Sequence, residues 1–508
     1  MYLRAGVLSL GLLLLSRVLG LLRESVQAAA FGSTGLGDAA IVMFTLPDLL
    51  VGILVSGALS YVLLPVWAQQ SAGVQAAAQR KMAVALTVGG LALGLLVWLS
   101  RGALVQALAP GLTGDIKAAS AWALGWSAVV LPLAMLAALW VTRLQHERDF
   151  VGVYAGSLVV NLALVIGLLV AAQGSLFGGA AGAASPHHVL NGLGACLVVA
   201  MLGRLAWLGW RLPASHLPTA ADQTSALPTA NVWLWAALSS GLLLVFPLVA
   251  RSLASRGGEG DLANFNYAWK LIELPLVLAV QLVASLAFTA ITRTLAATPE
   301  RQQVVGLAFL IAWTLACAAV AVVATFSLPI ANVLFGWGRM SVASLEVIAQ
   351  WSAIGIWSLL PQALMAVLLT VIATDGRMHA AVGVLGAGLA VLLLVGSLGD
   401  ANVANATKGS MVMWLLNAVF ACMALVLMLL ERRNIKAGFP YLACLTPLLV
   451  CMGLVSLKPL VLDLHVVLTL VFCVVFASLV TGSAIIASPV LRSLLREKLA
   501  KKFTIAAT

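Results

Sequence analysis

Charged residues are scarce in this sequence. Only 9% of its 508 residues are Asp, Glu, Lys or Arg, and 62% are hydrophobic. Soluble domains carry about 25% charged residues, because their surfaces face water. A chain with so few charges cannot cover such a surface, so we predict an integral membrane protein whose outer solvent is lipid.

Signatures of enzymes and metal sites are also missing. The sequence holds no GxSxG, HExxH or Walker motif. Its six cysteines are scattered through apolar stretches, and His187 and His188 stand together without further ligands nearby. We therefore predict no catalytic activity, no metal and no cofactor. Because no nucleotide-binding domain is present to use ATP, the remaining classes are a secondary transporter, a flippase or a channel.

The basic excess lies between the apolar runs. There are 28 Lys and Arg residues against 17 Asp and Glu, a net charge of +11. Such an excess can indicate nucleic-acid binding, but Lys and Arg also accumulate in cytoplasmic loops of membrane proteins, which we favour here. The N-terminus and alternate loops are predicted to hold Arg4, Arg80, Lys81, Arg143, Arg148, Arg204, Arg211, Arg293, Arg301, Arg377, Arg432, Arg433 and Lys436. The opposite loops hold fewer cations, so we predict that both termini are cytoplasmic.

A transmembrane helix needs about 20 mainly apolar residues. Fourteen segments of the sequence are apolar and near this length or longer. They are 5–30, 38–66, 82–109, 119–144, 151–173, 186–210, 231–254, 262–292, 303–325, 343–373, 378–398, 410–430, 441–457 and 464–487. The predicted fold is all-α, with about 14 transmembrane helices in a multi-pass arrangement.

The most polar internal stretch, 212–230, is predicted to be a cytoplasmic linker between two halves. Residues 1–211 would form an N-lobe of six spans and 231–433 a C-lobe of six. Two further helices would occupy 434–490, and 491–508 would be a basic cytoplasmic tail. A short internal similarity supports a parallel repeat with a central site: Gly37-Asp38 and Leu46-Pro47 correspond to Gly260-Asp261 and Leu274-Pro275.

Ionisable side chains inside the first predicted span point to a cavity, because such groups are costly in hydrocarbon. Arg17 and Glu24 are seven residues apart and share one helix face, whereas Arg23 projects about 120° away. We predict that all three line a cavity. An internal ion pair, or arginines that snorkel to the interface, are the alternatives.

Three more ionisable residues lie in later spans. Lys270 and Glu273 are i,i+3 neighbours that can pair, and a purely structural pair is the alternative to a cavity role. Asp48 begins a run of small residues at every fourth position of the second span. Close helix packing is therefore the alternative to a cavity role for Asp48.

Several motifs occur in a fixed order along the chain. They are Ser16-Arg17-Val18-Leu19-Gly20-Leu21-Leu22-Arg23-Glu24, Gly37-Asp38-Ala39, Leu46-Pro47-Asp48-Leu49-Leu50, Ser56-Gly57-Ala58-Leu59-Ser60, Tyr267-Ala268-Trp269-Lys270-Leu271 and Leu334-Phe335-Gly336-Trp337-Gly338-Arg339. Their order and spacing resemble the MurJ/MviN family, which contains the lipid II flippases of the MOP exporter superfamily. The first 70 residues carry the most specific part of this resemblance.

The resemblance implies fourteen helices in two lobes around a central cationic cavity. It implies a flippase of the bacterial inner membrane that moves an undecaprenyl-diphosphate-linked saccharide, lipid II above all, to the outer leaflet by alternating access. The expected partners are this lipid-linked saccharide, membrane lipids and cell-wall synthesis proteins, with no nucleic acid, and the expected state is a monomer. By position, Arg17, Arg23 and Asp38 match residues important in the family. The full predicted cavity set is Arg17, Arg23, Glu24, Asp38, Asp48, Lys270 and Glu273.

The sequence departs from the family pattern in the second span. Val51 and Gly52 stand where the family usually has two arginines, and Asp48 replaces a usual asparagine. Lys270 stands where an arginine is usual, which keeps the charge but loses bidentate geometry. The seventh and eleventh spans lack carboxylates, so the sodium site of some members is not predicted here.

Three other functions remain open at this point. The same fold would serve an exopolysaccharide or O-antigen repeat on the same lipid carrier, and the missing arginines favour that reading. A cation-coupled exporter of the MATE type would need acidic residues and few arginines in its cavity, which the first span opposes. A membrane scaffold that recruits cell-wall enzymes without transport is the third.

Overall fold

The computed structural model describes residues 2–171, 185–213, 228–292, 294, 298–399, 407–432, 440–460, 466–493 and 496. Every regular element within these ranges is helical. The chain divides into two compact units, one of Met1–Tyr267, Phe335–Ser344 and Asn402–Gly409, and one of Ala268–Leu334, Leu345–Ala401 and Ser410–Thr508.

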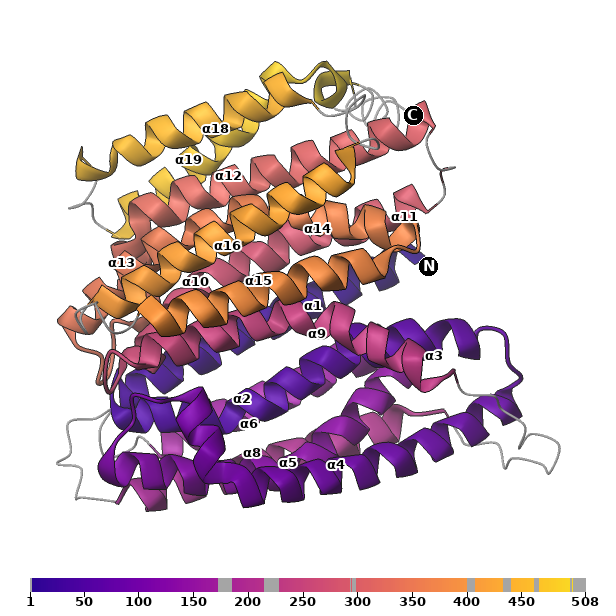
Figure 1. Ribbon diagram of the computed structural model, residues 1–508, viewed down its shortest axis with the longest axis vertical. Coiled ribbons are helices and arrows are strands. Elements are labelled where there is room, and N and C mark those ends of the chain that lie inside the picture. The colour runs from indigo at the N-terminus through magenta and orange to yellow at the C-terminus, as the bar shows by residue number, and fades with distance from the viewer. Residues whose placement is uncertain are drawn as a thin grey trace. The chain divides into compact units, whose positions relative to one another are not determined.

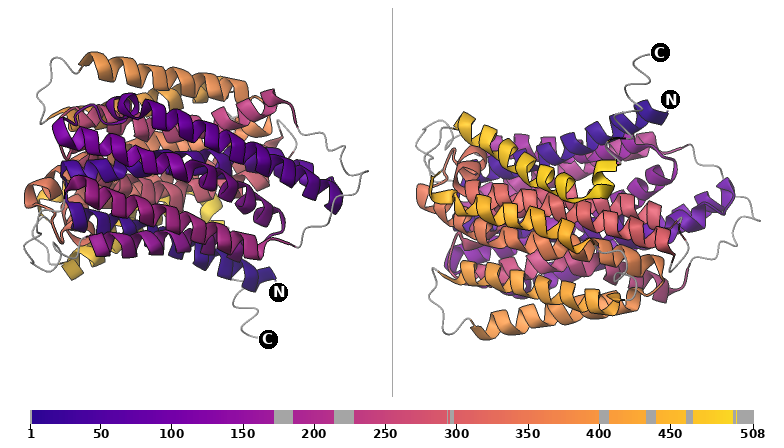
Figure 2. Two further views of the ribbon diagram at one scale, coloured as in Figure 1. Left: turned by 90° about the horizontal axis from the view of Figure 1, so that it is seen from below. Right: turned by 90° about the horizontal axis from the view of Figure 1, so that it is seen from above.

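The first unit is built from long apolar helices that lie side by side. They are α1 (Tyr2–Phe31), α2 (Gly35–Ile53), a π-helical turn η1 (Leu54–Ala58), α3 (Leu59–Trp67), α4 (Ala72–Leu108), α5 (Gly114–His146), α6 (Phe150–Ala171), α8 (Pro186–Arg211), α9 (Ala230–Ser255) and the start of α10 (Asp261–Pro275). Helix α5 runs beside α4 and α8, and α6 packs between α1 and α8 (Figure 1 and the left view of Figure 2).

Small residues allow these helices to approach closely. A Cβ added to Gly90 of α4 would meet the backbone of Pro132 on α5, and one added to Gly94 would meet the Ala128 carbonyl oxygen. The buried cluster where α2, α5, α6 and α8 meet also contains Ala39, Ala40, Ala119, Ala123, Ala134 and Ala200. In these helices, close backbone packing takes the place of packing between large side chains.

The second unit contains the remaining helices. They are the end of α10, η3 (Leu276–Gln281), α11 (Leu282–Ile291), α12 (Pro299–Phe335, up to Leu334), α13 (Val342–Gly355), η4 (Ile356–Ser358), α14 (Leu359–Thr374), α15 (Met378–Leu398), α16 (Lys408–Leu430), α18 (Tyr441–Ser456), η7 (Lys458–Leu460) and α19 (Val466–Ala487). Helices α18 and α19 lie side by side (Figure 1 and the right view of Figure 2). The Trp313 indole Nε1 of α12 donates to the Cys444 carbonyl oxygen of α18 at 2.9 Å, which fixes the C-terminal pair on this unit.

Twelve helices in the described ranges are long and apolar enough to cross a membrane, and Tyr441–Ser456 is a shorter apolar helix. Together with the charged helix α1 they make the fourteen that the sequence predicts, so the all-α multi-pass fold is confirmed. Most of the predicted linker 212–230 and tail 491–508 lies outside the described residues. The predicted lobe boundaries stay predictions.

Candidate functional site

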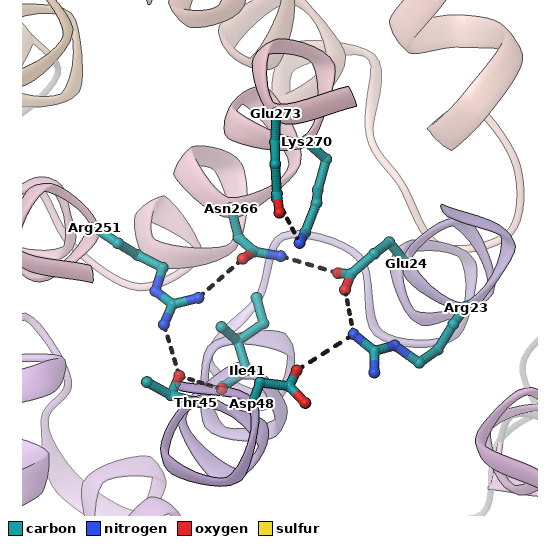
Figure 3. A network of polar contacts seen from close by, with 9 residues as sticks. All are labelled: Arg23, Glu24, Ile41, Thr45, Asp48, Arg251, Asn266, Lys270 and Glu273. Carbon is teal, nitrogen blue, oxygen red and sulfur yellow. Dashed lines mark hydrogen bonds and ion pairs between the residues drawn. The ribbon is translucent and has the colours of Figure 1, made fainter. Parts of the chain in front are cut away.

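Arg23 of α1 is held between two carboxylates of the first unit. Its Nη2 lies 2.7 Å from Glu24 Oε1 and 3.6 Å from Asp48 Oδ2 on α2 (Figure 3). The guanidinium also lies over the Phe44 ring, 5.7 Å from its centroid. The two carboxylates differ in access, because the Glu24 side chain is 6% exposed and the Asp48 side chain 63%. Glu24 is thus a fixed partner of Arg23, and Asp48 is an accessible one.

The second oxygen of Glu24 belongs to a chain of polar contacts. Asn266 Nδ2 on α10 donates to Glu24 Oε2 at 3.0 Å, and Asn266 Oδ1 accepts from Arg251 Nη1 on α9 at 2.9 Å. Arg251 Nη2 in turn donates to Thr45 Oγ1 on α2 at 2.6 Å. Helices α1, α2, α9 and α10 are therefore tied together by charged and amide groups (Figure 3). Arg251 was not among the predicted cavity residues, although a cation inside the predicted span 231–254 is a visible signal.

Asp38 of α2 is fully buried and serves the backbone. Its Oδ2 accepts from the Gly260 N–H at 2.6 Å, and its Oδ1 from the Ala263 N–H at 2.7 Å. These amides begin α10, where unpaired N–H groups and the helix dipole favour an anion. Asp38 therefore caps α10 from another helix. Its predicted contact with substrate remains a prediction.

Two glycines make this end of the unit compact. Gly260 has φ +88°, and a Cβ there would lie on the Ser33 carbonyl oxygen. Gly338 has φ +69°, and a Cβ there would lie on the Ala29 carbonyl oxygen. The same Ala29 oxygen accepts from the Arg339 N–H at 2.8 Å. Close backbone contact therefore joins the ends of α1, α2 and α10 to the segment Phe335–Ser344.

Lys270 and Glu273 form the predicted pair, with Nζ 2.8 Å from Oε2. Lys270 lies one helical turn after Asn266 on α10, within the second compact unit. Arg17 is exposed on α1. The convergence of Arg17, Arg23 and Lys270 on one chamber stays a prediction.

Several of the cations assigned to alternate loops lie inside helices, Arg143 and Arg204 among them, so the loop assignment of these residues was wrong. Arg143 is in the last turn of α5 and is 7% exposed, and Arg204 is within α8 and is 8% exposed. Arg143 has several partners, including Gln75 Oε1 at 2.7 Å and Glu147 Oε1 at 2.7 Å. The predicted spans 119–144 and 186–210 already contain these two residues, and α5 and α8 agree with those spans.

A cavity of about 510 Å³ opens within the second unit. Its lining includes Glu346, Gln350, Trp357, Trp414 and Lys458. None of the predicted cavity residues lies in its wall. Among the described residues, no group of three or more His, Cys, Asp or Glu side chains is placed to hold a metal ion.

Comparison with known proteins identifies the family. A family model described as "Lipid II flippase MurJ" matches residues 27–481. Over 111 residues the chain is 32% identical to "Probable lipid II flippase MurJ" of Rickettsia prowazekii (strain Madrid E), a match that spans 21% of this chain and 22% of that protein. This aligned part is thus less than a quarter of the relative's length.

Solved structures share the fold. "Lipid II flippase MurJ, inward closed conformation" matches with a TM-score of 0.75 at 13% identity, covering 94% of this chain and 98% of that one. An inward-facing multidrug resistance MATE family transporter of the MOP superfamily matches at 0.64 and 14% identity, covering 83% and 95%. At these identities the structural matches show the fold alone. The family model, which matches most of the chain, decides between them: the chain belongs to the MurJ lipid II flippase family.

Proposed function

We propose that this protein flips lipid II, an undecaprenyl-diphosphate-linked saccharide, from the cytoplasmic to the outer leaflet of the bacterial inner membrane. The observation that carries the proposal is Arg23, a cation inside a bundle of membrane-spanning helices with one fixed and one accessible carboxylate. Family membership supplies the cargo. The protein acts as a transporter and makes or breaks no covalent bond.

The physical problem is the headgroup, because an unpaired charge in hydrocarbon costs many kcal/mol. A guanidinium can meet it with paired, charge-assisted hydrogen bonds to phosphate oxygens. Arg23 is held in place by Glu24, at 2.7 Å, while Asp48 lies at 3.6 Å and is exposed. The diphosphate displaces Asp48 and takes its place beside Arg23. Asp48 is thus the exchangeable anion that occupies the site between cargoes.

The other predicted residues take supporting roles in this proposal. Arg17 and Lys270 add positive charge along the path, and Glu273 holds Lys270. Asp38 stabilises one closed end by capping α10. Alternating access would come from rocking of the two lobes around the site. The lipid tail would remain in the bilayer throughout.

The proposal extends to topology and partners. Both termini are cytoplasmic, in agreement with the distribution of Lys and Arg between the loops. The protein works as a monomer, and its natural neighbours are the enzymes that consume the flipped saccharide. Cysteine labelling at residues 2 and 508 in intact cells tests the orientation, because cytoplasmic termini are protected from a membrane-impermeant thiol reagent.

Complementation tests the function. We expect the wild-type protein to restore growth to a bacterium depleted of its lipid II flippase. Arg23→Ala should abolish the rescue at unchanged abundance, whereas Arg80→Ala, at an exposed position on α4, should retain it. Failure of the wild type to restore growth would contradict the cargo, and full rescue by Arg23→Ala would contradict the site.

A second cargo is favoured by one observation. Val51 and Gly52 remove two cations that the family usually carries, so the site suits another polyprenyl-diphosphate-linked repeat, of the exopolysaccharide or O-antigen type. Rescue of a strain that lacks an O-antigen flippase, without rescue of lipid II flipping, would establish this alternative.

A further inference from the structure

Arg204 is a buried cation without a partner of its own. It lies on α8, is 8% exposed, and its Nε is buried without a hydrogen-bond partner. Within the described residues it forms no ion pair. Burial of an uncompensated charge is strongly unfavourable. We therefore expect the Arg204 guanidinium to bind a ligand whose negative charge offsets this cost.

Arg143 shows how a structural arginine in the same unit is treated. It is equally buried, yet it donates to Gln75 Oε1, pairs with Glu147 and lies over the Trp67 ring at 5.4 Å. Such contacts fix the turn between α3 and α4 on the end of α5. The Nε of Arg143 is also buried without a hydrogen-bond partner, so the difference lies in the rest of the guanidinium: among the described residues, Arg204 has no ion pair and no ring contact like those of Arg143.

Asp48 is the exposed carboxylate of α2 that faces Arg23, with 3.6 Å between Asp48 Oδ2 and Arg23 Nη2. Val51 follows Asp48 by three residues, so the two side chains lie on one face of α2. The neighbouring residue Val51 packs on the buried cluster that includes Ala200 and Met201. These precede Arg204 by four and three positions, toward which a helical side chain leans.

We propose that Arg204 is a second guanidinium of the diphosphate site, so that Arg23 and Arg204 together bind the cargo where Asp48 stands between cargoes. This inference rests on the proposed function and deepens it. A diphosphate has two phosphoryl groups, and Arg23 of α1 and Arg204 of α8 would provide one cation for each. The charge absent from position 51 is supplied by α8 instead.

Binding measurements test this directly. Purified wild type and Arg204→Met would be titrated with undecaprenyl diphosphate and with undecaprenyl phosphate, and bound lipid quantified by native mass spectrometry. We expect Arg204→Met to bind the diphosphate about tenfold more weakly, with a smaller change for the monophosphate. Arg211→Met, the same substitution on the same helix at the Asp149 ion pair, should bind both lipids as the wild type does.

Moving the positive charge from position 204 to position 51 distinguishes a binding role of Arg204 from a structural one. We expect Arg204→Met to fail in complementation at normal abundance and thermal stability, and Val51→Arg added to it to restore rescue. A structural role predicts the opposite: loss of abundance, and no rescue by Val51→Arg. Equal diphosphate binding and full complementation by Arg204→Met would overturn the inference.

Two further readings keep the outcomes distinct. If Arg204→Met does not accumulate, Arg204→Lys takes its place in the binding test, because it keeps the charge but loses bidentate geometry. Diphosphate binding by Arg204→Lys several-fold weaker than in the wild type supports the inference, and unchanged binding refutes it. If the wild type itself fails to complement, the proposed function fails, while the lipid titration still decides the role of Arg204.

Discussion

Replacing Asp38 with asparagine tests how far one buried carboxylate holds α10 on α2. Both Asp38 oxygens accept backbone N–H groups, from Gly260 at 2.6 Å and Ala263 at 2.7 Å. Asparagine has nearly the same shape but only one acceptor oxygen. Its NH₂ group must therefore face one of the two N–H donors, which leaves that donor unpaired in a fully buried place.

The magnitude follows from these contacts. A hydrogen bond to a charged group contributes about 1.5–3 kcal/mol, and a buried donor left unpaired costs about 1–3 kcal/mol. One of the two bonds is lost and the other becomes neutral, so we expect Asp38→Asn to destabilise the protein by about 2–4 kcal/mol.

Thermal unfolding of the purified protein in detergent measures this loss. Asp261→Asn is the matched control, because it makes the same substitution in the first turn of α10, the helix that Asp38 caps. Asp261 accepts a hydrogen bond from the Asn264 side chain, Nδ2 to Oδ1 at 3.4 Å. The free energy of unfolding should fall by only about 0.3–1 kcal/mol in Asp261→Asn, the usual contribution of an acidic residue in the first turn of a helix. If Asp38→Asn unfolds at the same temperature as Asp261→Asn, the capping argument is wrong.

Three further predictions concern the same unit. Asp48→Asn removes the anion that competes for Arg23, so native mass spectrometry should show several-fold tighter binding of undecaprenyl diphosphate, and weaker binding would contradict the exchange. Gly260→Ala forces a Cβ onto a left-handed residue at φ +88°, and should lower the unfolding temperature through at least about 1–2 kcal/mol of backbone strain; unchanged stability would show that the turn relaxes. Arg211 lowers the pKa of Asp149 below its usual 3.8 through a bidentate ion pair; because the folded pKa is depressed, this stability is complete above pH 3.8 and is lost as pH falls through the folded pKa. The stability difference between wild type and Asp149→Asn should therefore vanish in strong acid, and a difference that persists there would refute the ion pair as its cause.

Local features of this protein were readable from sequence. The spans follow from apolar runs near the length of the bilayer, and the Lys270–Glu273 pair follows from spacing within one helix, as its 2.8 Å distance shows. The first span extends over Tyr2–Phe31, close to the predicted 5–30. In each case the cause of the structure lies within a few turns of a single helix.

Contacts between helices were not readable in the same way. Asp38 caps a helix that begins 223 residues later in the chain, at Asp261, and nothing in its own neighbourhood specifies that partner. Arg204 was counted among the loop cations although the predicted span 186–210 contains it, and it lies within α8. The α1–α2–α9–α10 network needs the tertiary fold to bring its members together, so only its α1 and α2 acids and cations were predicted.

The balance of charge among five residues explains why the proposed anion site contains carboxylates. Arg23, Arg204 and Arg251 supply three positive charges, and Glu24 and Asp48 supply two negative ones, a sum of +1. Without those acids the empty site would hold three uncompensated cations inside the bilayer, at a large desolvation penalty. Glu24 is buried and stays with Arg23, whereas Asp48 is 63% exposed and free to leave. The proposed exchange of Asp48 for a diphosphate would therefore keep the buried cations compensated before, during and after transport, and would let one site bind the cargo and still release it.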